Sequence, residues 1–437
     1  MKNFFINPLK KSAVLGATLG VLGFKNSIPV HHGSQGCTAF MKNIMTQHFR
    51  EIIPMQSTAI FNIALVMGDD SELLSGLSII ISKTNPEVLG LITTGIPQVR
   101  GDNIKYAIRQ FYKKKFGVKT KIIPIEVSDF EGDAEQGFAQ AVEAFVSEME
   151  FDGDASDTVL IVTDFSLTCG DIDEIRYMVS SFGLKPVIIP DISESLGSSF
   201  NNYYKITPGG AEFFSVMPKP LCALGIGVST IPVLEVLKDK GVKINNFSSL
   251  IGLKNVDKFI DFLSDMTGRV PDRTLLKKRG ELVDTMLDSH FYFNKKKVAL
   301  AAEPDLLSGL YYFVSEELGL EVKTAVTTYF RDDLSDIKPL AVGDLFEIEK
   351  DMGCVDILFC NSNGGILSEK YHNPIIKCGF PVKDEIGYPL KVFVGYRGTL
   401  NLLIQIANIC LSLDEEKSYE YKNYKGVKYH ESRILQH

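Results

Sequence analysis

The chain has 437 residues, of which 45% are hydrophobic and 23% are charged, and its formal net charge is −8. This length exceeds what one hydrophobic core usually serves, so we expect roughly two to four domains of a globular protein. The negative charge argues against nucleic acid or an anionic membrane as the main partner.

The first apolar segment is SAVLGATLGVLGF, residues 12–24, and lysines precede it. It resembles a signal peptide only faintly, because glycines dilute it and no A-x-A-type cleavage site follows. No uncharged apolar run reaches the ~18 residues that a membrane span needs. The seven cysteines are scattered, unlike a secreted disulfide framework. We therefore expect a cytoplasmic protein.

The segment HGSQGCTAF, residues 32–40, places Cys37 between two glycines and a helix-like run that continues to residue 49. Gly33 and Gly36 let the backbone approach a bulky neighbour closely. A thiolate at a helix N-terminus is favoured by the helix dipole and by free N–H groups. These features suit a ligand of an anionic iron–sulfur cluster, but such clusters usually need four cysteines and no local set exists. A structural cysteine in a tight turn fits the segment equally well.

Two adjacent histidines, His31 and His32, precede this segment. Adjacent side chains of an extended segment point to opposite faces, so the pair is poorly placed to share a metal ion. We expect one packed and one solvated imidazole.

The remaining cysteines carry no recognised metal-binding spacing. We expect Cys169 in an exposed turn before a helix. The others are expected to be small core residues, namely Cys222, Cys354, Cys360, Cys378 and Cys410.

Short β-branched runs alternate with helical patterns in the first half of the chain, which is typical of a doubly wound α/β domain over residues 61–191. In these runs apolar and polar residues do not alternate strictly, which is typical of parallel strands that are covered on both faces. Predicted strands are NIALVMG (62–68), EVLGLIT (87–93), KIIPIEV (121–127), TVLIVTD (158–164) and KPVIIPD (185–191), and predicted helices cover 102–117 and 134–150.

The same rhythm returns over residues 296–413, where residues 296–328 form one βαβ unit. Between the halves, CALGIGVST (222–230) predicts a strand and residues 275–293 a long helix. Later strands are expected at 356–364, 374–381 and 391–398, and a helix at 399–413.

The predicted fold class is therefore α/β, with three Rossmann-like domains whose parallel sheets are flanked by helices. The expected boundaries are an N-terminal segment at 1–60 that carries the candidate cluster ligand, Rossmann-like domains at 61–205, 206–294 (partly helical) and 295–413, and a polar surface tail at 414–437.

Nucleotide-binding motifs are incomplete. A GxGxxG fingerprint should follow the first strand, but GATLG precedes any predicted strand and GIGVST lacks its last glycine. Carboxylates follow NIALVMG, where a pyrophosphate would have to lie, and no P-loop pattern is present. Nucleotide binding and ATP hydrolysis are therefore not favoured.

The stretch HGSQGCTAFMKNIMTQHFREIIP, residues 32–54, resembles the signature of the nitrogenase component 1 superfamily, specifically its β-type branch. The resemblance extends along nearly the whole chain and implies three Rossmann-like domains. Further matching segments lie at 7–24, 93–103, 170–193, 282–307 and 395–408.

The departures from the family pattern are informative. In the catalytic β subunit of this family, three cysteines help to hold an eight-iron P-cluster at the αβ interface. The corresponding positions here are Ser12, Cys37 and Gly95, so only one ligand is kept. The resemblance then implies a smaller [4Fe–4S] cluster with one ligand, Cys37, from this chain and three from its partner. Gly33 and Gly36 would form the loop around that cluster.

The resemblance implies a scaffold for nitrogenase cofactor assembly rather than an independent enzyme. The expected partner is a NifE-like α-type subunit in an α2β2 heterotetramer. An eight-iron precursor, supplied by a NifB-like donor and held mainly by the partner, would mature there to the iron–molybdenum cofactor with a NifH-like iron protein. We assign no catalytic residue and no precursor ligand. His290 and residues 395–398 are interpreted as packing or interface positions.

Three alternatives remain open. Within the superfamily, a vanadium-nitrogenase assembly homologue or a subunit of a protochlorophyllide-type reductase would share these motifs. From another class, a nucleotide-sugar glycosyltransferase would share the α/β rhythm, although the incomplete nucleotide motifs weigh against it.

Overall fold

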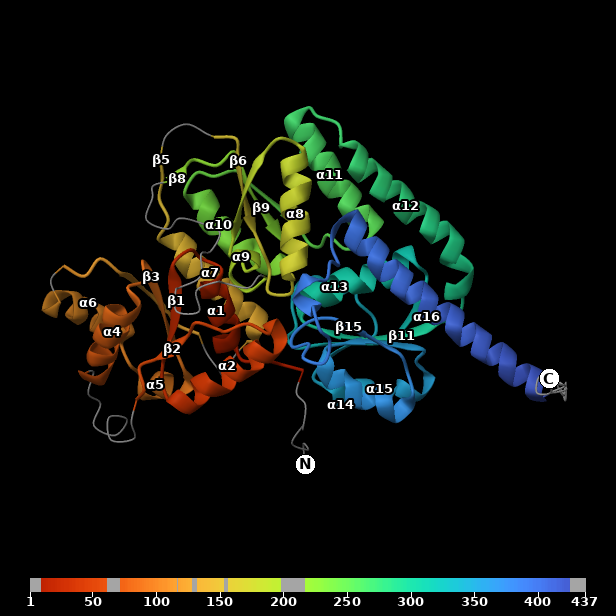
Figure 1. Ribbon diagram of the computed structural model, residues 1–437, viewed down its shortest axis with the longest axis horizontal. Coiled ribbons are helices and arrows are strands. Elements are labelled where there is room, and N and C mark those ends of the chain that lie inside the picture. The colour runs from red at the N-terminus through yellow and green to blue at the C-terminus, as the bar shows by residue number, and fades with distance from the viewer. Residues whose placement is uncertain are drawn as a thin grey trace, which may run out of the picture.

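The computed structural model describes residues 9–60, 71–115, 117–127, 132–152, 156–197 and 217–424, with side chains described as far as residue 415. Its main feature is a set of three parallel β-sheets with flanking helices, arranged around a common centre (Figure 1). The predicted fold class, α/β with parallel sheets flanked by helices, is confirmed.

The first sheet has the strand order β2-β1-β3-β4, and all its pairs are parallel. One face is covered by α4 and α6, the other by α1 and α7. The elements are α1 (Ala13–Leu22), β1 (Ser27–His32), α2 (Gln35–Phe49), β2 (Gln56–Ser57), α4 (Ser71–Thr84), β3 (Val88–Thr93), α5 (Gly95–Arg100), α6 (Ile104–Lys114), β4 (Lys121–Ile125) and α7 (Ala134–Ser147).

The second sheet has the order β10-β9-β6-β7 and is again parallel. Its strands and helices are β6 (Thr158–Val162), α8 (Cys169–Ser181), β7 (Lys185–Ile189), α9 (Ser193–Leu196), β9 (Cys222–Ile226), η1 (Val228–Thr230), α10 (Ile231–Asp239) and β10 (Ile244–Phe247). A separate short pair joins β5 (Phe151–Asp152) to β8 (Met217–Pro218). Two long helices follow, α11 (Leu253–Thr267) and α12 (Arg273–Ser289), with η2 (His290–Phe293).

The third sheet has the order β13-β12-β11-β14-β15. Its elements are β11 (Lys297–Ala302), α13 (Pro304–Tyr312), a π-helical turn (Phe313–Glu317), β12 (Glu321–Thr327), η4 (Asp332–Leu334), β13 (Leu340–Val342), α14 (Leu345–Glu349), η5 (Met352–Cys354), β14 (Ile357–Cys360), η6 (Ser362–Gly364), α15 (Gly365–Tyr371), β15 (Ile375–Lys377), η7 (Tyr388–Leu390) and α16 (Gly395–Tyr424).

The sheets do not follow the expected domain boundaries. Strand β1 at residues 27–32 lies at the heart of the first sheet, so residues 1–60 are not a separate segment before it. Strands β6 and β7, which were expected in the first domain, belong to the second sheet with β9. The nearly uniform strand–helix rhythm explains the difference, because it does not reveal which strands share a sheet.

Individual predictions differ in outcome. Strand β1 was not predicted, because the segment SIPVHH contains only two β-branched apolar residues and ends in two histidines. The predicted strand at 391–398 is wrong, because α16 begins at Gly395 and no strand precedes it there. The predicted strand at 62–68 lies outside the described residues.

The apolar segment at residues 12–24 forms helix α1, and every residue from Ala13 to Leu22 is buried. It packs against α7 at very close range: a Cβ on Gly16 would lie 1.7 Å from the Ala134 carbonyl oxygen, and one on Gly137 would lie 1.9 Å from the Ala13 carbonyl oxygen. The glycines that dilute this segment therefore let two helix backbones touch.

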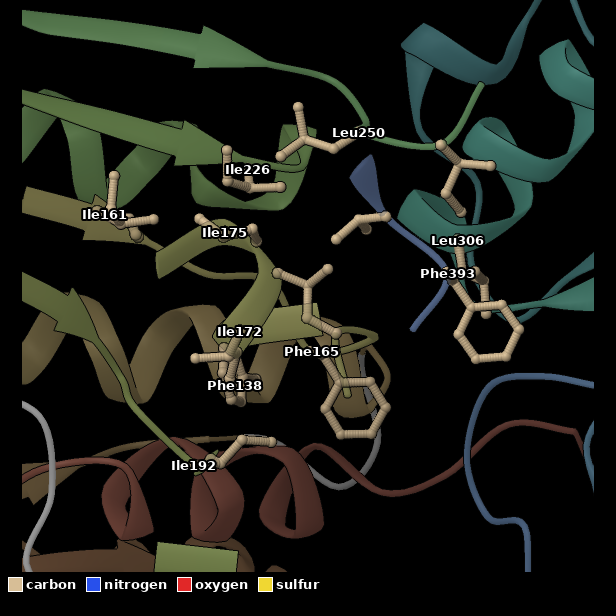
Figure 2. Packing of buried hydrophobic residues seen from close by; sticks show 14 of the residues in the cluster. Phe138, Ile161, Phe165, Ile172, Ile175, Ile192, Ile226, Leu250, Leu306 and Phe393 are labelled. Carbon is tan, nitrogen blue, oxygen red and sulfur yellow. The ribbon is translucent and has the colours of Figure 1, made fainter. Parts of the chain in front are cut away.

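One hydrophobic cluster runs through all three sheets. Figure 2 shows Phe138 of α7 and Phe165 near Ile161 of β6 and Ile226 of β9, with Leu306 of α13 on the far side. The domains therefore share a core. Among the described helices, none is long and apolar enough to cross a membrane.

Candidate functional site

Cys37 lies in the first turn of α2, whose N-cap residue is Ser34. Its side chain is exposed, and the Ser34 hydroxyl lies 3.4 Å from its sulfur. The positive end of the helix dipole and the free N–H groups of the first turn favour a negative charge at this position. The position at a helix N-terminus that the sequence predicted is confirmed.

The two loop glycines have different roles. A Cβ on Gly33 would lie 2.1 Å from the Thr94 hydroxyl oxygen, so only glycine fits there, whereas nothing lies within 4 Å of a Cβ on Gly36. Thr94 also donates its hydroxyl to the His32 carbonyl oxygen at 2.8 Å. Gly33 therefore joins the loop after β1 to the loop after β3, and Gly36 leaves the helix terminus open.

The two other positions of the family pattern lie at the same edge of the first sheet. Gly95 begins α5 directly after β3, where His32 is in register with Thr93. Ser12 caps α1, its Oγ accepting from the Val14 N–H at 3.1 Å. Helix α1 runs back along β1, since Thr18 of α1 contacts His31 of β1. Segments far apart in sequence thus meet at one carboxyl edge.

The adjacent histidines point to opposite faces of the sheet, as predicted. The His31 imidazole bridges the Thr18 and Thr38 hydroxyls at 2.7 and 3.2 Å. His32 bridges the Thr58 hydroxyl and the Asp102 carboxylate, both at 3.1 Å. Both rings are buried, so the predicted solvated imidazole is wrong.

These two histidines hold the Cys37 loop in place, a role that the sequence did not indicate. Burial lowers the pKa of His31 to about 4, so its neutral ring ties α1 to Thr38, the neighbour of Cys37. On the other face, Arg100 pairs with Asp102 and Asp102 with His32. Only the pairing of β1 with β3 brings these residues together.

Five of the other six cysteines are buried, unlike Cys37. Cys222, Cys360, Cys378 and Cys410 are buried as predicted. Cys169 is buried at the start of α8 and Cys354 is exposed, so both of those predictions are wrong. Burial raises the pKa of the Cys169 and Cys360 thiols to about 12, which keeps them protonated. Cys37 and Cys354 are the two exposed thiols, and the Cys354 sulfur donates to the Asp351 carbonyl oxygen at 3.1 Å.

Large apolar side chains are exposed on α2 and α5, the two helices that begin at this edge of the first sheet. Phe40 of α2 is 67% exposed, and Ile96 and Val99 of α5 are 48% and 75% exposed. Phe49, at the other end of α2, is buried. Several exposed large apolar side chains on neighbouring helices are typical of an interface rather than of a free surface.

The two remaining segments of interest have local roles. His290 is exposed, and its ring lies 3.7 Å from that of Phe291. Gly398 packs against the backbone of Phe393, and Arg397 pairs with Glu174 at 2.8 Å. The 395–398 segment is therefore a packing position.

A second polar cluster, at the centre of the molecule, was not predicted. Arg331 donates to the Glu135 carboxylate at 2.6 Å and to the Asp305 carboxylate at 2.5 Å. Asp305 also accepts from the backbone N–H groups of Val228 and Ser229 at 2.9 and 3.0 Å. Because these residues come from all three domains, the cluster joins the domains to one another.

Asp164 lies beside this cluster and accepts from the backbone N–H and hydroxyl of Ser166, both at 2.6 Å. Burial, reinforced by the nearby Asp305, raises the pKa of Asp164 to about 8. A cavity of about 20 Å³ between the two carboxyl groups has room for about one water molecule. No group of three or more metal-ligating side chains occurs in the described part of the chain.

Comparison with known proteins gives consistent matches over the whole length. Residues 12–411 match the family model described as nitrogenase component 1 type oxidoreductase. A relative named nitrogenase iron-molybdenum cofactor biosynthesis protein NifN, from Rippkaea orientalis, is 36% identical and is covered over 98% of each chain. Proteins of the same name from Nostoc and Klebsiella pneumoniae are 34% and 30% identical, with 95% and 97% of this chain covered and 95% and 94% of theirs.

Among solved structures, a chain of nitrogenase Cp1 at pH 6.5 superposes with a TM-score of 0.88 at 25% identity, covering 100% of this chain and 98% of that one. A chain of nitrogenase Cp1 at pH 5 gives 0.69 at 13% identity, covering 93% and 89%. At 13% identity, the second match supports the fold alone. The superposition in the first match covers the full length of this chain.

Proposed function

The chain belongs to the nitrogenase component 1 type oxidoreductase family, and we propose that within it the chain is a NifN-like scaffold subunit for assembly of the iron–molybdenum cofactor. In this role it acts without catalytic residues of its own. It contributes one ligand, Cys37, to a [4Fe–4S] cluster shared with an α-type partner. Relatives named as NifN that are 30–36% identical over nearly the full chain support this assignment.

The observation that carries the proposal is the contrast among the three family positions. Cys37 presents an exposed thiol at a helix terminus. At the same edge of the sheet, Ser12 carries a hydroxyl and Gly95 has no side chain, so neither can supply a thiolate. An eight-iron cluster would lack two ligands here. A single thiolate suits one corner of a smaller cluster whose other cysteine ligands come from outside this chain.

The surroundings of Cys37 fit a cluster at a subunit interface. The helix terminus favours an anionic ligand, and the open space beside Gly36 leaves room for a bulky group. Within the described residues, the other cysteines are buried apart from Cys354, which lies in η5 of the third domain. When bound, such a cluster would supply electron transfer, and the residues of this chain would hold and orient it.

The exposed apolar residues Phe40, Ile96 and Val99 support a protein partner over this edge. Burying them against a NifE-like subunit would exclude water from the cluster and stabilise the interface. The eight-iron precursor, in this proposal, is cargo held mainly by that partner.

The test is substitution of the two exposed thiols in the anaerobically co-purified complex. We expect Cys37→Ala to lose most of the intersubunit iron, about four atoms per αβ pair, and its [4Fe–4S] EPR signal. The fold should persist, because the side chain is exposed. Cys354→Ala, the matched control, should keep both iron and signal. An unchanged signal in Cys37→Ala would refute the ligand assignment, and a metal-free chain that binds no α-type subunit would refute the scaffold role.

A further inference from the structure

The loops before strands β1, β3 and β4 enclose a groove of about 1090 Å³ at the amino edge of the first sheet. Helix α4, whose last turns line the groove, and α6 lie together at one end of the molecule (Figure 1). Because the strands are parallel, Cys37 and Gly95 follow β1 and β3 at the opposite, carboxyl edge. The groove is therefore separate from the candidate cluster site.

Hydrogen bonds between these loops fix the shape of the groove. The Asn26 carbonyl oxygen accepts from the Glu87 N–H at 3.1 Å, and the Asn26 amide donates to the Glu87 carboxylate at 2.9 Å. The Thr120 hydroxyl donates to the Pro86 carbonyl oxygen at 2.7 Å, and the Tyr112 hydroxyl donates to the Thr120 carbonyl oxygen at 2.9 Å. A ligand that binds here loses little affinity to the ordering of loops, because the loops are already held.

The rim of the groove is basic, although the chain as a whole is acidic. Residues 103–121 include seven lysines and arginines and no aspartate or glutamate, whereas the whole chain has 54 acidic and 46 basic residues. The three lysines at 113–115 are exposed where α6 ends, and exposed Lys119 lines the groove together with Lys25. This local excess of positive charge favours an acidic ligand.

Structural roles explain only part of this charge. The negative end of a helix dipole stabilises lysines in the last turn, which accounts for Lys113 and Lys114. Lys105 and Lys121 are in ion pairs with glutamates. Lys119 lies beyond the end of α6 and has no ion pair among the described residues, so neither role applies to it.

The lining of the groove favours a peptide over a nucleic acid. Besides the lysines it contains the apolar side chains of Ile81 and Val118, the amide of Asn85 and the carboxylate of Glu87. A nucleic acid carries a charge on every residue and would be repelled by Glu87 and by the net charge of −8. A peptide can place carboxylates on the lysines and neutral residues over the rest of the lining.

From these observations we propose that the groove is a docking site for an acidic segment of a second protein. Carboxylates of that segment pair with Lys115 and Lys119 on the rim, and its neutral residues lie over Ile81 and Val118. A subunit that covers the Cys37 edge does not compete for this groove, because the two sites lie at opposite edges of one sheet. The proposal does not depend on the proposed function.

Charge reversal on the rim is the first test. Fluorescence anisotropy of a short labelled poly-glutamate peptide measures binding to the complex co-purified with its α-type partner, and a poly-serine peptide of the same length gives the background. We expect K115E/K119E to weaken binding by about tenfold or more, because attractive contacts become repulsive. K185E/K238E, the control, reverses two lysines of the second domain that are 73% and 58% exposed, and it should bind as the wild type does. Equal losses in both variants would overturn the site, because the peptide would then respond to net charge alone.

A second pair of variants fills the groove without changing its charge. Ser82 is an exposed residue of α4 that lines the groove, and Ser75 is an exposed serine of the same helix that does not. We expect Ser82→Trp to lose most of the peptide binding, because the indole occupies the space that the peptide needs. Ser75→Trp should keep it. Wild-type binding in Ser82→Trp would show that the peptide binds elsewhere.

Two further probes test the class of partner, namely a labelled single-stranded DNA of equal charge and anionic vesicles. If either binds more tightly than the peptide and loses binding in K115E/K119E, the assignment to a protein segment is wrong. A wild-type complex that does not bind the peptide also overturns the proposal. The Cys37 assignment has separate readouts, iron content and the EPR signal. If no α-type subunit co-purifies, the proposed function fails, and the same measurements on the full chain alone decide the groove.

Discussion

At the scale of single residues, buried carboxyl groups determine how this protein responds to pH. Burial raises the pKa of Asp164 to about 8 and that of Glu303 to about 7. The folded chain therefore holds protons on these groups at pH values where the unfolded chain has released them. Each group therefore affects the free energy of unfolding in the same direction. Its stabilising contribution is fully present below the pKa of about 4 that it has in the unfolded chain. That contribution is lost as the pH rises through the pKa that it has in the folded chain.

Asp164→Asn tests this. Asparagine keeps the oxygen that accepts from Ser166 but cannot ionise. We expect the fall in unfolding free energy between pH 5.5 and 7.5 to become shallower, by at most about 1.4 kcal/mol per pH unit, the value for one proton. Melting midpoints measured across that range give the slope. Asp157→Asn, at an exposed ion pair with Lys185, is the control and should leave the slope unchanged; an unchanged slope in Asp164→Asn would contradict the assignment.

At the scale of elements, the contact between α1 and α7 determines the position of the Cys37 loop. Helix α1 covers β1 and contacts His31, and His31 in turn holds Thr38 beside Cys37. The contact depends on glycines that bring the two helix backbones together. A change in this packing should therefore alter both stability and the candidate site.

Graded substitutions along α1 test this packing. A Cβ at Gly16 would lie 1.7 Å from the Ala134 carbonyl oxygen, whereas one at Gly20 would lie 3.1 Å from its nearest neighbour, the Phe138 carbonyl oxygen. We expect Gly16→Ala to cost about 1–3 kcal/mol of stability, as overpacked cores do, and Gly20→Ala to cost clearly less. Calorimetric unfolding ranks the two, and equal stability of both variants would show that the helices separate at little cost.

At the scale of the whole molecule, the polar cluster around Arg331 joins the three domains to one another. Arg331 pairs with Glu135 of the first domain and Asp305 of the third, and Asp305 binds backbone N–H groups of the second. The guanidinium fork makes contacts that a lysine could not reproduce. Removing it leaves carboxyl groups buried without their cation.

Arg331→Met should therefore destabilise the protein by about 3–5 kcal/mol, the usual cost of breaking a buried ion pair. Arg279→Met is the control, because Arg279 donates to both carboxylate oxygens of Asp257 at a partly exposed site. There we expect a loss within about 1 kcal/mol. Equal losses in the two variants, measured by denaturant unfolding, would mean that the central cluster does not join the domains.

Much of the fold was predictable because local pattern decides it. Buried runs such as residues 158–164 and 297–302 became strands, and Cys37 lies at the helix terminus that its glycines indicated. Strand β1 escaped prediction because SIPVHH contains only two β-branched apolar residues and ends in two histidines. The exposures of Cys169 and Cys354 were mispredicted because burial depends on what packs over a residue, not on its neighbours in the chain.

The sequence by itself determined most of the secondary structure, the α/β class, the family resemblance and the identity of the single thiol at the family position, because these depend on local periodicity and on residue type. Only the tertiary structure decided which strands share a sheet, that His31 and His32 brace the Cys37 loop and that Arg331 joins the domains. These features join segments that are distant along the chain, and no local pattern records which distant segments come into contact.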